Sequence, residues 1–173
     1  MCELIEPEAL EPIVKNNSGI IVDVCDYSRY AKAHIPSALH LQPQETFGPH
    51  PHKIGDLPNL NRIKEIIIKL GIIKHKPVYI YDDIGGVLAS RLIWLLDCVG
   101  YHNWILINGG LISWLKEGRD YKSTSSIDKT QEKKEIELKL KSLAHEYNFT
   151  KNQIISTLHL SLIHISEPTR RTD

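Results

Sequence analysis

The 173-residue chain lacks an excess of either charge and has only three cysteines, and both shortages narrow what it can do. Twenty-one basic and twenty-one acidic residues cancel, so there is no electrostatic reason to expect nucleic acid or an acidic membrane surface as a partner. Cys2, Cys25 and Cys98 contain no CxxC pair and are odd in number, which argues against a disulfide framework. Free thiols fit a reducing compartment, and we expect a cytoplasmic protein.

Long hydrophobic runs are also missing. The longest apolar stretches, such as residues 92–96, are far shorter than a membrane span. The first fifteen residues are acidic and mixed, unlike a signal peptide. Hydrophobic residues make up 42% of the chain, which is ordinary for a globular protein. The length suits one domain, with a tail or the start of another.

Metal and cofactor motifs are not recognisable either. His50 and His52 are the only close pair of histidines, and no cysteine or carboxylate stands near them at a known ligand spacing. We therefore expect a solvated loop there, no metal and no cofactor. The glycines match neither the dinucleotide-binding nor the P-loop pattern, so nucleotide binding is not expected.

What the chain does contain is an alternation of short apolar strands and amphipathic helices. Strands are predicted at residues 20–24, 39–41, 78–81 and 104–107. Helices are predicted at residues 6–15, 26–33, 87–99 and 111–117, and around Ile63 to Leu70. Asp26 is expected to cap the second of these helices, and residues 42–59 read as a long loop. The fold class is α/β with an open parallel sheet.

The loop between the strand at 78–81 and the following helix is the candidate functional site. An open α/β sheet places its chemistry outside the carboxyl end of a strand, at a helix N-terminus. The adjacent acids Asp82 and Asp83 could bind a cation or act as acid and base, but we favour a capping role for one of them. Arg91 could face this loop or a partner domain, or make a surface salt bridge. The loop residues are Asp82, Asp83, Ile84, Gly85, Gly86 and Val87.

Three segments in order resemble the rhodanese family. VDVCDYSRYAKAHIPSA (22–38) resembles its opening motif, and INGGLISWLKEGR (107–119) resembles its closing motif. YDDIGGVLASRLIWLLDCVGYHN (81–103) resembles the loop and helix in the N-terminal half of two-domain thiosulfate sulfurtransferases. The matching motif positions are Asp23, His34, Ile35, Pro36, Ala38, Gly109, Gly110, Trp114 and Gly118.

The resemblance implies a rhodanese-like open parallel sheet with helices on both faces, over residues 1–121. Ala33 and Ser37 stand where the family usually has glycine. If these positions need positive φ, each substitution costs roughly 1 kcal/mol.

The chemistry implied by the family needs a cysteine in the loop. A rhodanese takes a sulfane sulfur from a donor such as thiosulfate onto that cysteine, then passes it from the persulfide to cyanide or a thiol. Asp82 aligns with the cysteine, and a carboxylate cannot carry this sulfur, so the resemblance implies an inactive domain without a catalytic residue. Cys25 is the candidate reactive thiol, the alternative being a small residue at a variable position. Cys98 reads as a buried, inert thiol.

The resemblance also implies a partner. In tandem rhodaneses the N-terminal domain carries Asp and the C-terminal domain carries Cys, so we expect a second rhodanese domain in the same parent chain and a small sulfur-containing substrate in the full-length protein. Residues 122–159 would form a linker and the start of that domain. Residues 160–173 resemble the translation of a sequencing-library adapter, an artefactual tail. The alternative is a stand-alone inactive module for protein binding or regulation.

Overall fold

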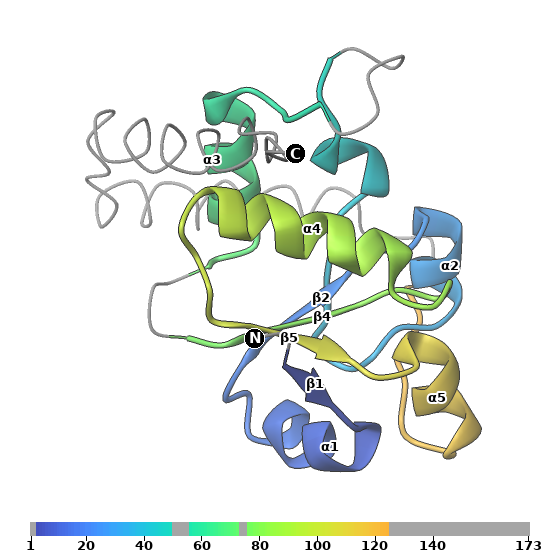
Figure 1. The fold of residues 1–173 in the computed structure, drawn as a ribbon. Helices are drawn as coiled ribbons and strands as arrows, with labels where there is room; N and C mark the ends of the chain where they lie inside the picture. Colours follow the sequence, from blue (N-terminus) through green and yellow to red (C-terminus); the bar gives the residue numbers. More distant parts are fainter. Residues whose placement is uncertain (1–2, 50–55, 73–75, 125–173) are drawn as a thin grey trace, which may run out of the picture.

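The computed structural model describes residues 3–49, 56–72 and 76–124, and these form a five-stranded parallel sheet (Figure 1). All four neighbouring strand pairs are parallel, in the order β1-β5-β4-β2-β3. This confirms the predicted fold class. The strands are β1 (Leu4–Ile5), β2 (Ile20–Asp23), β3 (Leu39–His40), β4 (Val78–Tyr81) and β5 (Trp104–Ile107).

Helices cover both faces of the sheet, as expected for strands that are buried on both sides (Figure 1). One face packs against α3 (Leu60–Lys69) and α4 (Val87–Cys98). The other packs against α1 (Pro7–Lys15), α2 (Tyr27–Lys32) and α5 (Gly110–Lys116). Each layer therefore has its own hydrophobic core. Successive side chains of β2 and β4 point alternately into one core and into the other.

Strand β1 is the element that the sequence pattern did not predict. It is only two residues long and pairs in parallel with β5, Leu4 opposite Leu106. Two residues cannot show an alternation of apolar and polar side chains, so this edge strand exists through its partner. A short 3-10 helix, η1 (Pro43–Thr46), likewise interrupts the predicted long loop.

Arg91 holds the segment after β3 against α4. Its guanidinium donates hydrogen bonds to the main-chain oxygens of Thr46 and Asp56. It also lies over the rings of Phe47, 5.0 Å from the centroid, and Trp94, 4.5 Å from the centroid. None of these partners is a carboxylate or a residue of the candidate loop. The predictions of a contact with the candidate loop and of a surface salt bridge were therefore wrong, because the hydrogen-bond acceptors lie more than thirty residues away in sequence. Contact with a partner domain stays a prediction.

Some expectations fall on other parts of the chain. The predicted tail and the part of the predicted linker from residue 125 onward lie outside the described residues. His50 and His52 also lie outside them. No helix within the described ranges is long and apolar enough to cross a membrane.

The two positions where the family usually has glycine differ in backbone conformation. Ser37 has φ of 63°, in the left-handed region that disfavours residues with a Cβ. Ala33 has φ of −158° and is extended, a conformation that any residue adopts. The expected cost therefore applies to Ser37 and not to Ala33.

Replacing Ser37 with glycine should raise the free energy of unfolding by up to about 1 kcal/mol, because glycine adopts positive φ without strain. Ala33→Gly is the matched control, and it should lower stability slightly since it only adds freedom to the unfolded chain. Urea unfolding of both variants measures the difference. Equal effects of the two substitutions would contradict the backbone argument.

Candidate functional site

The loop between β4 and α4 folds around the carboxylate of Asp82, which is 1% exposed. One oxygen, Oδ1, accepts the N–H groups of Ile84 (3.0 Å) and Gly86 (2.7 Å). The other, Oδ2, accepts those of Leu88 (2.8 Å) and Ala89 (3.1 Å) in the first turn of α4. Four backbone donors at the positive end of a helix thus surround one buried negative charge.

The two glycines of this loop allow its amides to turn inward. Gly85 and Gly86 have φ of 82° and 92°, which a residue with a Cβ rarely adopts. The first turn of α5 packs on the outside of the loop. The N–H of Leu111 donates to the main-chain oxygen of Asp82 (3.0 Å), and a Cβ on Gly110 would overlap that oxygen. The Gly-Gly pair of the closing motif is therefore needed where two loops touch.

The two adjacent acids have separate roles. Asp82 caps α4 through Leu88 and Ala89, which confirms the capping prediction. Asp83 makes an ion pair with Arg29 of α2, with 2.6 Å between Oδ2 and Nε. Each carboxylate already has its own partners, so the loop does not present them as a pair for a cation or for acid–base chemistry. Asp26, in contrast, stands at the start of α2, but its side chain accepts no capping hydrogen bond from the backbone of that helix, contrary to expectation.

Cys25 lies close to this loop, but its environment keeps the thiol protonated. The residue is fully buried, and its N–H donates to Oδ1 of Asp23 (2.7 Å). Burial raises the pKa of the Cys25 thiol far above its usual value, and the carboxylates of Asp23 and Asp83 raise it further. A nucleophilic cysteine needs a lowered pKa and access to solvent. The structure therefore favours the inert alternative over a reactive thiol.

Residues of the opening motif join distant segments around the sheet. The ring of His34 stacks on Tyr30, and its Nδ1 donates to the Tyr30 carbonyl (2.8 Å). The Ile35 N–H donates to the Tyr81 hydroxyl (3.0 Å), and the Tyr30 hydroxyl donates to the Ala38 carbonyl (2.9 Å). These contacts fix the loop between α2 and β3. They are structural roles that the motif alone does not reveal.

Trp114 of the closing motif anchors the segment that follows α5. Its indole is 1% exposed, and Nε1 donates to the main-chain oxygen of Asp120 (2.7 Å). Gly118 ends the helix with φ of 69°, and Gly109 begins it with φ of 66°. Two further hydrogen bonds, between the backbones of Lys122 and His34, tie the same segment to the opening motif.

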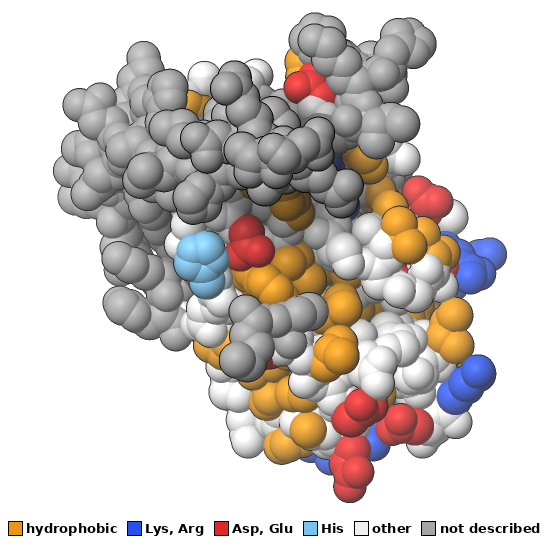
Figure 2. Space-filling view, viewed as in Figure 1, with side chains coloured by type: hydrophobic (Ala, Val, Ile, Leu, Met, Phe, Trp, Pro, Cys, Tyr) orange, Lys and Arg blue, Asp and Glu red, His pale blue; other side chains and the backbone are white. Residues whose placement is uncertain are grey.

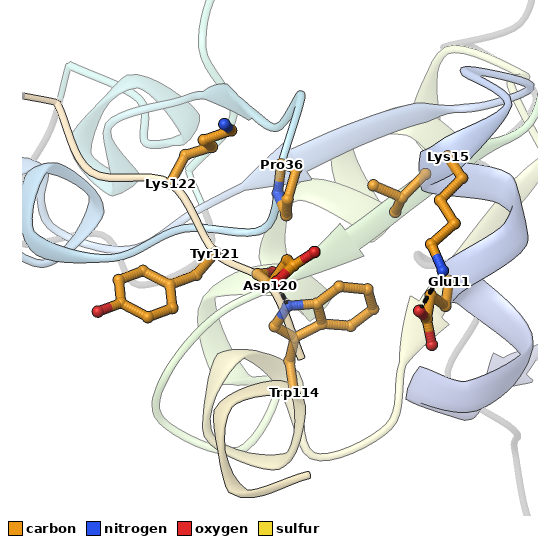
Figure 3. A pocket seen from close by; sticks show the side chains of 8 residues that line it. Glu11, Lys15, Pro36, Trp114, Asp120, Tyr121 and Lys122 are labelled. Carbon is orange, nitrogen blue, oxygen red and sulfur yellow. Dashed lines mark hydrogen bonds and ion pairs between the residues drawn. The ribbon is translucent and has the colours of Figure 1, made fainter. Parts of the chain in front are cut away.

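A pocket of about 420 Å³ lies on the α1 and α5 side of the sheet, and sequence patterns gave no sign of it (Figure 3). Glu11 and Lys15 form an ion pair (2.6 Å) on one wall, facing Trp114 and Pro36. None of its lining residues belongs to the loop at 82–87, so this pocket is separate from the candidate site. Its lining residues are Glu11, Val14, Lys15, Pro36, Trp114, Asp120, Tyr121 and Lys122.

Among the described residues, no group of three or more His, Cys, Asp or Glu side chains is arranged to hold a metal ion. Cys25 and Cys98 are both free thiols. The chemistry that the loop itself offers is the stabilisation of an anion by backbone amides, and Asp82 supplies that anion from within the chain.

Known proteins share this fold and sequence. A thiosulfate sulfurtransferase of Pseudomonas aeruginosa is 36% identical over 116 residues, which cover 67% of this chain and 43% of that protein. One of Azotobacter vinelandii is 39% identical over 119 residues, with the same coverage. The solved structure of 3-mercaptopyruvate sulfurtransferase from Leishmania major superimposes with a TM-score of 0.60 at 23% identity, covering 73% of this chain and 38% of that one. This chain thus spans less than half the length of these relatives.

Removing the buried carboxylate should leave four backbone N–H groups without a hydrogen-bond acceptor. Asp82→Ala is expected to lower the free energy of unfolding by at least about 3 kcal/mol, since each unsatisfied buried donor costs about 1–3 kcal/mol. Acetate or sulfate should partly restore the stability of this variant, in a saturable way, by entering the vacated space. Thermal unfolding with increasing anion concentration measures both effects. Asp26→Ala is the control, and equal stability of the two variants would refute the role of Asp82.

The raised pKa of Cys25 predicts a thiol that does not react in the folded protein. At pH 8, iodoacetamide should leave Cys25 unmodified in the native chain and modify it after unfolding in guanidinium chloride, since only the thiolate reacts. Mass spectrometry of the peptide that contains Cys25 gives the extent of modification. Rapid modification under native conditions would restore Cys25 as a reactive thiol.

The family follows from the agreement of these features. The model of the rhodanese-like domain matches residues 6–117, which span the opening motif, the loop at 82–87 and all but the last two residues of the closing motif. The sheet is parallel, as the motifs imply, and each of the two relatives above matches 67% of the chain. The chain belongs to the rhodanese-like domain family.

Proposed function

We propose that this chain is the non-catalytic rhodanese half of a sulfurtransferase. The whole enzyme would move sulfane sulfur from thiosulfate or a similar donor to cyanide or a thiol acceptor. The sulfur would be carried as a cysteine persulfide in a second rhodanese domain of the same polypeptide. The domain described above would support that catalytic domain and shape the entrance to its site.

The observation that carries this proposal is the carboxylate of Asp82 inside the loop. Four backbone N–H groups converge on the place where a sulfur-carrying loop needs its reactive atom. A carboxylate oxygen held there cannot displace sulfite from thiosulfate. Cys25, the nearest thiol considered, is buried and has a raised pKa, so it does not replace the missing nucleophile.

The reaction itself would then occur in the second domain. Its cysteine thiolate attacks the outer sulfur of thiosulfate, a new S–S bond forms, and sulfite leaves with the electron pair of the broken S–S bond. The carbon of cyanide next attacks the outer sulfur of the persulfide. Thiocyanate leaves and the thiolate returns, so atoms and electrons balance without a further reactant.

Two further observations support the whole-protein part of the proposal. The matched regions make up 43% of the two bacterial thiosulfate sulfurtransferases, which leaves room in those proteins for a second domain of similar size. The free thiols Cys25 and Cys98 are compatible with a reducing compartment, and we place the protein in the cytoplasm.

One observation favours a second candidate, a stand-alone inactive module for protein binding or regulation. The match to the solved Alr3790 protein from Anabaena covers all of that chain and 83% of this one, with a TM-score of 0.58 at 19% identity. A single unit of this fold can therefore be folded without a second one. The gene sequence beyond residue 159 separates the candidates, because the module requires a stop codon and the enzyme requires a second domain.

The 173-residue chain should form no thiocyanate from thiosulfate and cyanide. A longer polypeptide that continues into the proposed second domain, called here the extended polypeptide, should form it. Colorimetric detection of thiocyanate as its iron complex measures both activities. Replacing the cysteine of the second domain with serine should abolish turnover by the extended polypeptide, and Cys25→Ser should leave it unchanged. Turnover by the 173-residue chain that Cys25→Ser removes would overturn the proposal.

A further inference from the structure

The pocket on the α1 and α5 side of the sheet combines apolar surface with charges of both signs. Its volume of about 420 Å³ lies within the usual range for a small-molecule site, about 300–1,000 Å³. Its apolar lining consists of Val14 of α1, Pro36 of the opening motif and Trp114 of α5. On the face seen in Figure 2, acidic and basic side chains both lie over α1 and α5. The pocket therefore suits a molecule that has an apolar part as well as charged groups.

The charges on the α1 wall of this pocket already have partners. The carboxylate of Glu11 pairs with Nζ of Lys15 (2.6 Å) and with the guanidinium of Arg119. Arg119 also pairs with Glu117 (2.7 Å), and it lies 5.6 Å from the ring centroid of Trp114. These contacts hold one wall of the pocket in place, and the charges of Glu11 and Lys15 compensate each other there.

The charges on the opposite wall have no such partners. Asp120 and Lys122 line the pocket from the segment after α5 (Figure 3). Within the ranges that the structure describes, neither side chain makes a hydrogen bond or an ion pair. The backbone of the segment is nevertheless fixed, since the Asp120 carbonyl accepts Nε1 of Trp114 (2.7 Å) and Lys122 exchanges two backbone hydrogen bonds with His34 (both 2.9 Å). A preorganised wall thus presents one carboxylate and one ammonium beside apolar surface.

We propose that this pocket binds a free α-amino acid with an apolar side chain. The α-ammonium pairs with the carboxylate of Asp120, and the α-carboxylate pairs with the ammonium of Lys122. The apolar side chain lies against Val14 and Trp114. The inference is independent of sulfur transfer, because none of these residues belongs to the loop at 82–87.

The charges of the pocket favour a zwitterion over a simple ion. The four charged lining side chains are two acidic and two basic, so their formal charges sum to zero. A lone anion would meet the carboxylates as well as the ammonium groups, and a lone cation would meet the opposite mixture. A zwitterion satisfies one unpaired group of each sign.

The spacing of the two unpaired groups favours a free amino acid over a peptide. Asp120 and Lys122 are two positions apart, and Lys122 forms a β-bridge with His34. In extended backbone, residues at this spacing point to the same side. The two charged groups of the ligand must therefore lie close together. A free α-amino acid carries both on one carbon atom, whereas a peptide separates them by at least one further residue.

The test is a titration of the 173-residue chain followed by nuclear magnetic resonance, with three probes that share one apolar group. L-leucine carries both charges, 4-methylpentanoate lacks the ammonium, and 3-methylbutylamine lacks the carboxylate. We expect L-leucine to shift the signals of the Trp114 indole N–H and the Lys122 backbone N–H in a saturable way, with a Kd of about 1 mM for a ligand of this size. Each analogue should bind at least about tenfold more weakly, because it lacks one charge-assisted hydrogen bond.

Two nearly isosteric variants assign the charges of the ligand to their partners. Asp120→Asn should bind L-leucine no more tightly than the wild type binds 4-methylpentanoate. Lys122→Gln should bind it no more tightly than the wild type binds 3-methylbutylamine. Both substitutions keep the backbone hydrogen bonds of the segment. Asp26→Asn and Lys116→Gln remove the same charges outside the pocket, and they should leave the Kd for L-leucine unchanged.

Three outcomes would overturn the inference. The first is the absence of a saturable shift with L-leucine at concentrations up to about 20 mM, where a ligand with a millimolar Kd is largely bound. The second is an equal Kd for the three probes, which would indicate apolar contact alone. The third is tighter binding of L-leucylglycine than of L-leucine, which would assign the pocket to a peptide N-terminus. The probe series on the wild type decides the inference even where a variant fails to fold.

Discussion

The structure depends most on the buried carboxylate of Asp82. A charge that is 1% exposed needs compensation, and four backbone N–H groups and a helix N-terminus provide it. The main-chain oxygen of the same residue accepts a hydrogen bond from Leu111 in the first turn of α5. The loop, the start of α4 and the start of α5 are therefore positioned by one residue. Gly86 and Gly110 follow as requirements of this arrangement, the first for its backbone conformation and the second for close approach.

The sheet and its helices could be predicted from the sequence because each has a local pattern. Strands β2 and β4 are short apolar runs that are buried throughout, and α3 shows its apolar face at helical spacing. That one of the two adjacent acids caps α4 was also predictable, since an acid before a helix suits the dipole, but the sequence did not distinguish Asp82 from Asp83. The sequence pattern does not show that both carboxylate oxygens accept hydrogen bonds or that the residue is almost fully buried. Both features depend on the path of the loop.

Other features required knowledge of neighbours that are distant in sequence. Arg91 contacts two carbonyl groups and the ring of Phe47 in a segment more than thirty residues earlier, where periodicity gives no signal. Cys25 looked accessible because it follows a strand at the edge where ligands bind. Its burial and the nearby carboxylates of Asp23 and Asp83, which together raise its pKa, arise from tertiary packing. The two-residue strand β1 forms only because it pairs with β5 through backbone hydrogen bonds.

Under the proposed function, the arrangement of the loop explains how a fold that can stabilise a reactive anion can persist without the reactive atom. Backbone amides that converge on one point are costly when unsatisfied, so a loop of this shape needs an anion at its centre. In this loop the carboxylate of Asp82 fills that need. Under the proposed function, a covalently held carboxylate takes the place of a thiolate or persulfide, and stability is favoured over chemistry. Under the proposed function, what remains for this domain to contribute is its surface and the segment that follows α5. The backbone of His34 and the indole of Trp114 hold that segment in place.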